Sequence, residues 1–238
     1  DKWSVNRNLT SNYGLRIDIP TTMSSPSTND EFNASTYATA NGVKVGEVPS
    51  AKVMWSPRFG FRWYTDDAHK SLLRGGVGLF TGRVPFVWLS NLWNNTGIEM
   101  KGTTITSNVP GMSQYANDPL AAANSATGKA SKPTINTASK NFKYPQVLRA
   151  NLAWEYTLPL DIKMTLEGLY SKTLNNVWFE NLALSDNGKR VYAVSSDYAN
   201  ASTTYFDRNA GSYYAIINLK NTNKCYSYSL SATLEKAF

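Results

Sequence analysis

The chain has 238 residues, of which 17% are charged and 13% aromatic, and its formal net charge is +7. The basic residues are scattered among carboxylates, which disfavours nucleic-acid binding, because a clustered basic patch is the expected footprint of that function. The single cysteine, Cys225, excludes an intrachain disulfide, and no apolar run reaches the roughly 18 residues of a transmembrane helix. The sequence starts at Asp1 with neither an initiator Met nor a signal peptide, so we expect a processed or excised piece.

The first part of the chain predicts three strands, because apolar and polar residues alternate with a period of two. In the first strand Tyr13 and Ile17 share one face, and Arg16 points to the other. In the second and third strands Arg58 and Arg74 lie opposite apolar neighbours in the same way. A short turn over residues 65–70 and a long polar connection over residues 21–54 separate these strands. The strands are expected over residues 4–20, 55–65 and 71–83.

The clearest alternation lies in residues 148–172, which predict a hairpin of two strands around a turn at residues 159–161. Even positions such as Leu152 and Trp154 are apolar, whereas most odd positions are polar or charged. The second of these strands can continue through residues 177–179. A last strand is expected over residues 224–238, and residues 213–219 fit either a further strand or part of an ordered loop.

Two settings compete for such two-faced strands. A soluble β-sandwich buries the apolar face in its core, whereas a membrane barrel turns that face to lipid and the polar face to a wet lumen. The connections alternate between long and short, which is typical of outer-membrane barrels. The sequence thus favours an all-β fold, a segment of an antiparallel transmembrane β-barrel. The expected long extramembrane loops cover residues 21–54, 84–141 and 184–212.

The number of strands indicates that this barrel segment is incomplete. About six or seven membrane strands are predicted, whereas a closed single-chain barrel needs about eight or more. We therefore expect the chain to contribute part of a larger barrel.

Several strings along the chain resemble the barrel of TonB-dependent outer-membrane receptors of the Bacteroidetes type. The closest likeness is to SusC-like and Oar-like members, which carry a carboxypeptidase-regulatory-like domain ahead of the plug. The first strings are SPRFGFRW, LRGGVGLFTGR and PFVWLSN, which occur together and in this order. The strings lie in residues 56–63, 73–83, 85–91, 142–147, 165–174 and 219–230.

The resemblance implies a barrel of about 22 strands, closed by a plug domain that is not visible in this chain and energised through TonB. It implies uptake of a bulky nutrient, a peptide or glycan, by loop capture and plug-gated passage across the outer membrane of a Gram-negative bacterium. The expected partners are outer-membrane lipid, the plug, the TonB system and, as a further candidate, a surface lipoprotein. A passive porin-like or structural surface barrel and a soluble carbohydrate-binding β-sandwich are the alternatives.

The polar faces of the predicted strands provide the candidate lumen-lining and plug-facing residues. Glu155 and Glu167 share this face with Arg149 and Lys163, which favours ion pairing over the paired catalytic carboxylates of a glycosidase. In the loops, exposed aromatic side chains are the candidate substrate contacts, with self-packing or a girdle at the membrane edge as the alternatives. The candidate loop residues are Phe86, Trp88, Trp93, Tyr115 and Tyr205. The candidate lumen residues are Arg16, Arg58, Arg62, Arg74, Gly76, Gly78, Arg149, Glu155, Lys163 and Glu167.

Two further patterns are weaker matches to known sites. The glycines of residues 74–82 lie in a strand without a following Lys-Ser/Thr, so a phosphate loop is disfavoured. Asp66, Asp67 and His69 could bind a metal, but they fall in a short turn, where Asp commonly caps the backbone. Because His69 is the only histidine, a His-based triad within the chain is excluded. We expect no catalytic site, no metal and no cofactor.

Overall fold

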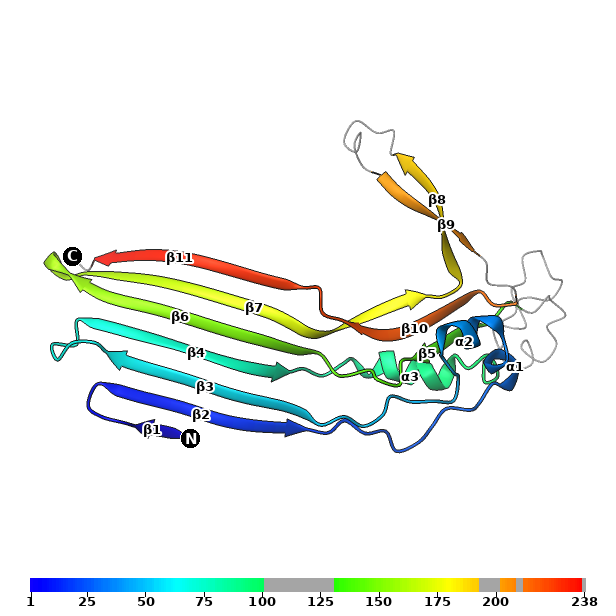
Figure 1. The fold of residues 1–238 in the computed structure, drawn as a ribbon, viewed down its shortest axis with the longest axis horizontal. Helices are drawn as coiled ribbons and strands as arrows, with labels where there is room; N and C mark the ends of the chain where they lie inside the picture. Colours follow the sequence, from blue (N-terminus) through cyan, green and yellow to red (C-terminus); the bar gives the residue numbers. More distant parts are fainter. Residues whose placement is uncertain (101–130, 193–201, 209–211, 237–238) are drawn as a thin grey trace, which may run out of the picture.

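The computed structural model describes residues 1–100, 131–192, 202–208 and 212–236 and consists mainly of one open, largely antiparallel sheet. The sheet order is β1-β2-β3-β4-β6-β7-β10-β5, and β11 also pairs with β7 (Figure 1). The sheet strands are β1 (Lys2–Ser4), β2 (Leu9–Asp18), β3 (Met54–Tyr64), β4 (Ser71–Thr81), β5 (Thr134–Ala138), β6 (Gln146–Leu158), β7 (Ile162–Asn181), β10 (Ala215–Thr222) and β11 (Tyr226–Lys236).

The predicted strands are found apart from the start of the first one, and short and long connections alternate between them as expected. β3, β4 and β11 each contain 11 residues, and β2 contains 10. A tilted strand of about 9–11 residues has the length of a bilayer's hydrocarbon core. The short turns between β3 and β4 and between β6 and β7 lie at one end of the sheet, and the long connections lie at the other (Figure 1). The η1 turn (Pro159–Asp161) joins β6 to β7.

β7 is the longest strand of the described residues, with 20 residues, and two strands in succession pair with it. Thr222 of β10 faces Asn176, and Tyr226 of β11 faces Lys172. The pairing is therefore interrupted between residues 223–225 and residues 173–175, three on each side, and the register is the same before and after this interruption. Cys225 lies in this interruption, and its carbonyl accepts a hydrogen bond from the amide of Thr173. β10 and β11 thus act as one long strand, and most of residues 213–219, left open by the sequence, belong to it.

The first predicted strand, residues 4–20, is wrong at its start. Residues 5–8 form a turn, in which the Asn6 side chain accepts hydrogen bonds from the amides of Asn8 and Leu9. β1 folds back on β2 as an antiparallel partner. The prediction missed the turn because it did not consider the hydrogen bonds of the Asn6 side chain. For residues 9–18 the predicted strand is correct.

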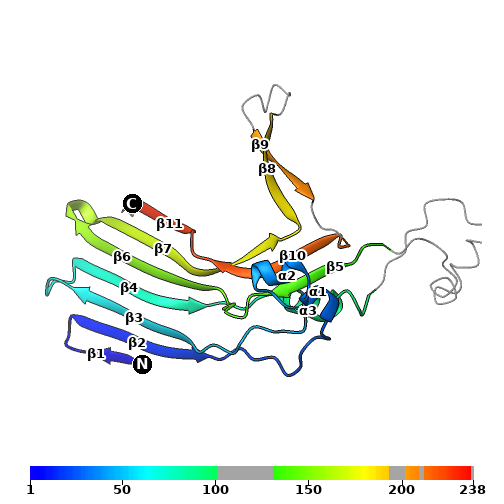
Figure 2. The ribbon, with the colours of Figure 1, turned by 45° about the vertical axis from the view of Figure 1, so that its right-hand side comes forward.

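The long connections contain regular structure that the sequence analysis assigned to loops. Short helices α1 (Asp30–Asn33) and α2 (Thr36–Asn41) start at the N-caps Asn29 and Ser35, whose side chains accept hydrogen bonds from backbone amides. The second long connection holds α3 (Phe86–Asn94) and β5. In the third, β8 (Leu184–Tyr192) and β9 (Ser202–Arg208) form a separate hairpin that stands away from the main sheet (Figures 1 and 2). No helix among the described residues is long and apolar enough to cross a membrane.

Two hydrophobic cores lie at the loop end of the sheet, on opposite faces of β5 and β10. Ile216 faces Ile135, and both pack with Phe32 of α1 and Ala38 of α2. Leu219 and Ala138 point to the other face and pack with α3. We call these two clusters with α1, α2, α3 and β5 the cap.

We call the rest of the main sheet, which is β2, β3, β4, β6, β11 and the part of β7 that pairs with them, the strand region. Among the described residues it has no core comparable to these two clusters. Leu152 is 53% exposed, Trp154 40% and Leu166 39%, and the described residues place no second sheet against them. The β-sandwich alternative required these side chains to be buried between two sheets, so it is wrong. An apolar face of this size left open to its surroundings marks a contact with another apolar phase or partner.

Candidate functional site

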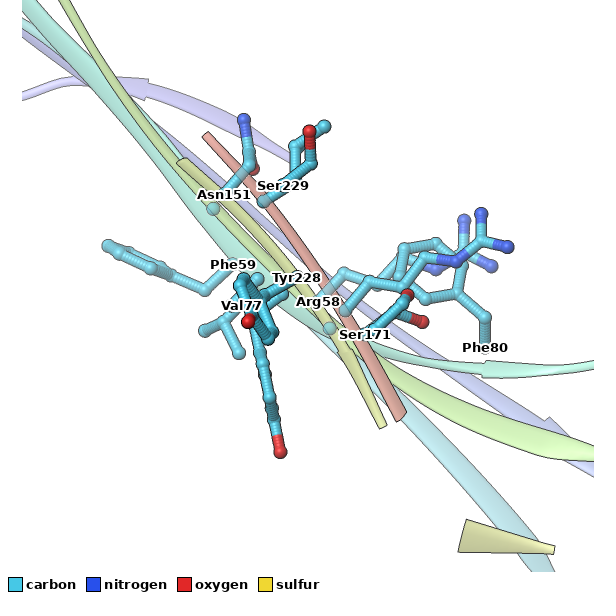
Figure 3. A pocket seen from close by; sticks show the side chains of 15 residues that line it. Arg58, Phe59, Val77, Phe80, Asn151, Ser171, Tyr228 and Ser229 are labelled. Atoms are coloured by element: carbon cyan, nitrogen blue, oxygen red, sulfur yellow. The ribbon is translucent and has the colours of Figure 1, made fainter. Parts of the chain in front are cut away.

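The register of the sheet separates its side chains into two faces. Residues directly opposite each other on antiparallel strands point to the same side. We call the side carrying charged residues the polar face and the other side the apolar face. Figure 3 shows the sheet edge-on, with Phe59, Val77 and Tyr228 on one side and Arg58, Phe80 and Ser171 on the other.

On the apolar face, large side chains follow one another across the strands. Tyr13 faces Phe59, which faces Val77 in turn. The same row continues through Ala150 to Tyr170 and ends at Tyr228 of β11. Tyr228 is 76% exposed, although it lies in a regular strand. Aromatic and aliphatic side chains on this face have no protein partner layer among the described residues.

On the polar face, all of the predicted lumen residues within β2, β3, β4, β6 and β7 lie together. One row places Arg58 opposite Gly78 and Gly78 opposite Arg149. A second row places Arg62 opposite Arg74. The alternation of the sequence therefore predicts their common side correctly, and their function as a lumen lining stays a prediction. The residues that share this face are Arg16, Arg58, Arg62, Arg74, Gly76, Gly78, Arg149, Glu155, Lys163 and Glu167.

Between these two rows, the polar face has a floor of small residues. Asn12, Gly60, Gly76 and Asn151 are successive partners across four strands. A Cβ at Gly76 would lie 3.0 Å from the Phe59 carbonyl oxygen, which is too close for an undisturbed sheet. A Cβ at Gly60 would meet nothing closer than 3.5 Å. The side chains of this floor therefore rise little above the sheet. Close packing requires a glycine at position 76 but not at position 60.

The two predicted carboxylates share one cation, which is Arg74. Its Nε donates to Glu155 Oε1 at 2.5 Å, and its Nη1 lies 3.8 Å from Glu167 Oε1. Arg149 and Lys163 were the predicted partners on this face, but the register places Arg74 between the carboxylates of β6 and β7. A guanidinium placed between the two carboxylates is the arrangement of an ion-pair cluster and not that of a glycosidase acid and nucleophile.

Two further arginines of the polar face, Arg58 and Arg149, lie next to the ring of Phe80. Phe80 was not among the predicted site residues. The Arg58 Cζ lies 4.5 Å from the centroid of the Phe80 ring and the Arg149 Cζ 5.9 Å from it. A Cβ at Gly78 would lie 3.1 Å from Arg58 Cγ and 3.2 Å from the Phe80 ring. Gly78 thus lets the arginine and the ring approach each other. An aromatic residue at a polar-face position was the signal available in the sequence.

Two of the remaining polar-face cations, Arg16 and Arg62, have local partners, and among the described residues Lys163 has only cross-strand neighbours assigned. Arg16 donates to Asp18 Oδ1 at 2.7 Å. Arg62 donates to the Tyr64 hydroxyl at 2.6 Å, and its Cζ lies 5.2 Å from the Tyr64 ring centroid. Lys163 faces Thr157 on one side and Glu235 on the other.

The loop aromatics have different environments. Phe86, at the start of α3, is 80% exposed. Trp88 packs edge-on against Phe179 at a centroid distance of 5.3 Å, and Trp93 packs against the α3 core. The candidate Tyr115 lies outside the described residues, and Tyr205 lies in β9. For Trp88 and Trp93 self-packing is observed, and substrate contact stays a prediction for all five.

The turn with Asp66, Asp67 and His69 uses these side chains to hold the backbone and the neighbouring turn. Asp66 accepts hydrogen bonds from the amides of Lys70 and Ser71. Asp67 accepts one from the Asn8 side chain, and His69 stacks on Tyr64 at a centroid distance of 4.1 Å. Among the described residues, no group of three or more His, Cys, Asp or Glu is placed to hold a metal ion.

The hydrogen bonds to Asp66 predict a pH-dependent turn. The amide of Ser71, followed by that of Lys70, lowers the Asp66 pKa from its ordinary value of 3.8. A lowered pKa means that this stabilisation is complete above the ordinary value and is lost as the pH falls through the lowered pKa. We expect hydrogen-exchange protection of the Lys70 and Ser71 amides to fall over that acidic range, and Asp66→Asn to abolish the pH dependence. Asp67→Asn, which touches neither amide, is the control, and an unchanged pH profile in Asp66→Asn would contradict this assignment.

Among the comparisons with known proteins, a family model identifies a barrel domain. A family model described as "Outer membrane beta barrel domain" matches residues 1–238. No curated protein matches the chain. Two similar solved structures are the siderophore receptor PirA from Acinetobacter baumannii (12% identity, TM-score 0.44) and a mutant of the ferric enterobactin receptor PfeA from Pseudomonas aeruginosa (13%, 0.43). Each similarity covers 98% of this chain, which spans only 24% and 23% of those receptors.

Proposed function

Because the chain belongs to the outer-membrane β-barrel domain family, we propose that it forms part of the wall of a transport barrel. The protein is located in the outer membrane. In this proposal the apolar face contacts lipid, and the polar face lines a hydrated lumen. Residues 1–238 then form one partial barrel domain, whose connections over residues 21–54, 84–141 and 184–212 lie outside the membrane.

The segregation of the two faces is the observation that carries this proposal. Leu152, at 53% exposure, and Tyr228, at 76%, point to the same side of a sheet that no second layer covers. The opposite side holds the arginines and the Arg74–Glu155 ion pair. Lipid is the favourable surrounding for the apolar face and water for the polar face. A wholly aqueous or wholly apolar surrounding would be favourable for only one of the two faces.

The finer assignment extends the proposal to a TonB-dependent receptor of the SusC-like, Bacteroidetes type. The strings in residues 56–63, 73–83 and 85–91 support it, and they fall on β3, β4 and α3. The remaining wall would come from further strands, to about 22 in all, with a plug in the lumen and the TonB system as energy source. The cargo would be a bulky nutrient, a peptide or glycan, and a surface lipoprotein is a candidate partner.

In this mechanism the chain binds and guides a solute without covalent chemistry. The cap provides ordered aromatic side chains at the loop end of the sheet, among them the exposed Phe86. The low floor at Gly60 and Gly76 leaves space at the middle of the polar face. The charged rows on both sides of the floor keep the passage hydrated.

An uptake assay separates this proposal from a passive porin-like barrel. Cells producing the full-length protein would be given a fluorescently labelled oligopeptide or a labelled linear dextran, with and without a protonophore. The energised receptor predicts that uptake stops when the proton gradient collapses. Uptake that continues unchanged would contradict it and favour the passive barrel, since both share the same wall.

A further inference from the structure

We propose that Arg58 and Arg149 form a binding site for the oxyanion group, carboxylate or phosphate, of a solute in the lumen. The inference depends on the proposed function in one respect, which is that the polar face lines water. The two arginines lie on either side of Gly78 in one row across β3, β4 and β6. Both side chains are exposed, and both guanidinium groups lie over the Phe80 ring.

The first argument is the missing counter-charge. No salt bridge among the described residues joins Arg58 or Arg149 to a carboxylate, in contrast to Arg16 and Arg74. The row continues through Ser171 to Ser227, which are neutral hydroxyl groups. Two neighbouring cations without an acid repel each other, so an anion between them gains from both charges.

The second argument is pre-organisation. A guanidinium stacked on an aromatic ring uses its flat face and keeps its N–H edges free. These edges match the two oxygens of a carboxylate or phosphate, which accept bidentate hydrogen bonds. Arg58 Cζ and Arg149 Cζ lie 4.5 Å and 5.9 Å from the Phe80 centroid, so the ring attracts both cations and offers no oxygen acceptor to their N–H donors. Gly78 allows this arrangement because a Cβ there would press on Arg58 and Phe80 together.

The third argument is the surrounding chemistry, which favours a solute anion. On the polar face, the residues that line the groove around Phe80 besides the two arginines are glycines, Leu169, Asn151 and serines, and none of them is acidic (Figure 3). Asn151 and Ser171 border the arginines on the polar face and can add hydrogen bonds to a bound oxyanion. Two acids of the polar face, Glu155 and Glu167, are already held by Arg74.

Arginine-specific labelling tests the site. The full-length protein in outer-membrane vesicles would be treated with phenylglyoxal, and the labelling rate of each arginine followed by peptide mass spectrometry. Inorganic phosphate and glutarate serve as probes in separate arms, which distinguish a phosphate from a carboxylate site. We expect Arg58 and Arg149 to be labelled quickly without probe and to slow together along one saturation curve. At ten times the half-saturation concentration the slowing should be roughly tenfold.

Matched variants separate the site from general charge effects. Gly78→Ala keeps both arginines but disturbs their packing on Phe80, so the protection by the probe should weaken several-fold. Gly60→Ala adds the same methyl group on the same face, where nothing lies within 3.4 Å, and should leave the protection unchanged. Equal protection in both variants would overturn the pre-organised site.

Other outcomes would also overturn the proposal. If Arg58 and Arg149 react slowly without any probe while Arg62 reacts quickly, a carboxylate of the protein already occupies the site. If the exposed Arg83 is protected as strongly as Arg58, the anion acts by general screening. If Arg62 is also unreactive, water does not reach the polar face, and the proposed function fails together with the site.

Discussion

Replacing Leu152 by arginine is expected to destabilise the protein folded in a bilayer by about 2–4 kcal/mol, the depth-dependent cost of a charge on the lipid face near mid-membrane. Leu152 lies near the middle of β6, opposite Gly75 of β4, and is 53% exposed on the apolar face. In water such an exposed position would tolerate arginine with little change. A large cost is therefore specific to a lipid-facing side chain.

The neighbouring Asn151 supplies the matched control. It points to the polar face between Gly76 and Leu169, so Asn151→Arg should change the folding free energy by less than about 0.5 kcal/mol. Urea titration of the full-length protein in lipid vesicles, followed by tryptophan fluorescence, measures both variants. Equal costs for Leu152→Arg and Asn151→Arg would contradict the assignment of the faces.

Replacing Phe32 by alanine is expected to destabilise the cap by about 3–5 kcal/mol, as for other large side chains removed from a packed core. Phe32 is fully buried, and its ring meets the Tyr213 ring edge-on at a centroid distance of 5.4 Å. The same core raises the pKa of Tyr213, chiefly by burial and then through the charge of Glu31. Because this core joins α1 to β5 and β10 and not to the strand region, the loss should be local.

Hydrogen exchange monitored by mass spectrometry tests this prediction. In Phe32→Ala, protection should fall in α1, α2, β5 and the start of β10, while the amides of β3, β4 and β6 keep theirs. Met23→Ala, at a fully exposed position, should leave both regions unchanged. A uniform loss of protection across the sheet, or no loss in the cap, would contradict the separation of cap and strand region.

The alternation of apolar and polar residues predicted the strands and the face of each side chain, because a period of two is a local property of extended backbone. The hairpin over residues 148–172 is an example, since every face assigned there is found in the register of β6 and β7. The turn at residues 5–8 was missed because its signal is one side chain, Asn6, and not a periodicity.

Elements of the cap were not predictable from the same pattern. β5 is a strand because it pairs in parallel with β10, about 80 residues further along the chain, and no local pattern reports such a partner. The helices α1 and α2 have only 4 and 6 residues, too few for a helical period to be recognised. Their available signals were the N-caps Asn29 and Ser35 and the C-cap Gly42 of α2.

The sequence predicted which charged residues share the polar face, but it did not predict which of them contact one another. Sequence alternation brought Glu155, Glu167 and the arginines to one face, but the choice of Arg74 as their partner depends on the register between β4, β6 and β7. Phe80 was overlooked because an aromatic residue on the polar face is a weak signal by itself, and its partners Arg58 and Arg149 are known only from the register.

The most direct test of the two-faced wall is a spin-label scan of β6. Cys225 and any other native cysteine of the full-length protein would be replaced by serine. Single cysteines at positions 149, 150, 151 and 152 would then carry the label, with the protein in lipid vesicles. Collisions with molecular oxygen report lipid, and collisions with a water-soluble nickel chelate report the lumen. The account predicts that oxygen collisions peak at residues 150 and 152 and nickel collisions at residues 149 and 151. Accessibility without this alternation, or exclusion of both reagents at the even positions, would contradict it.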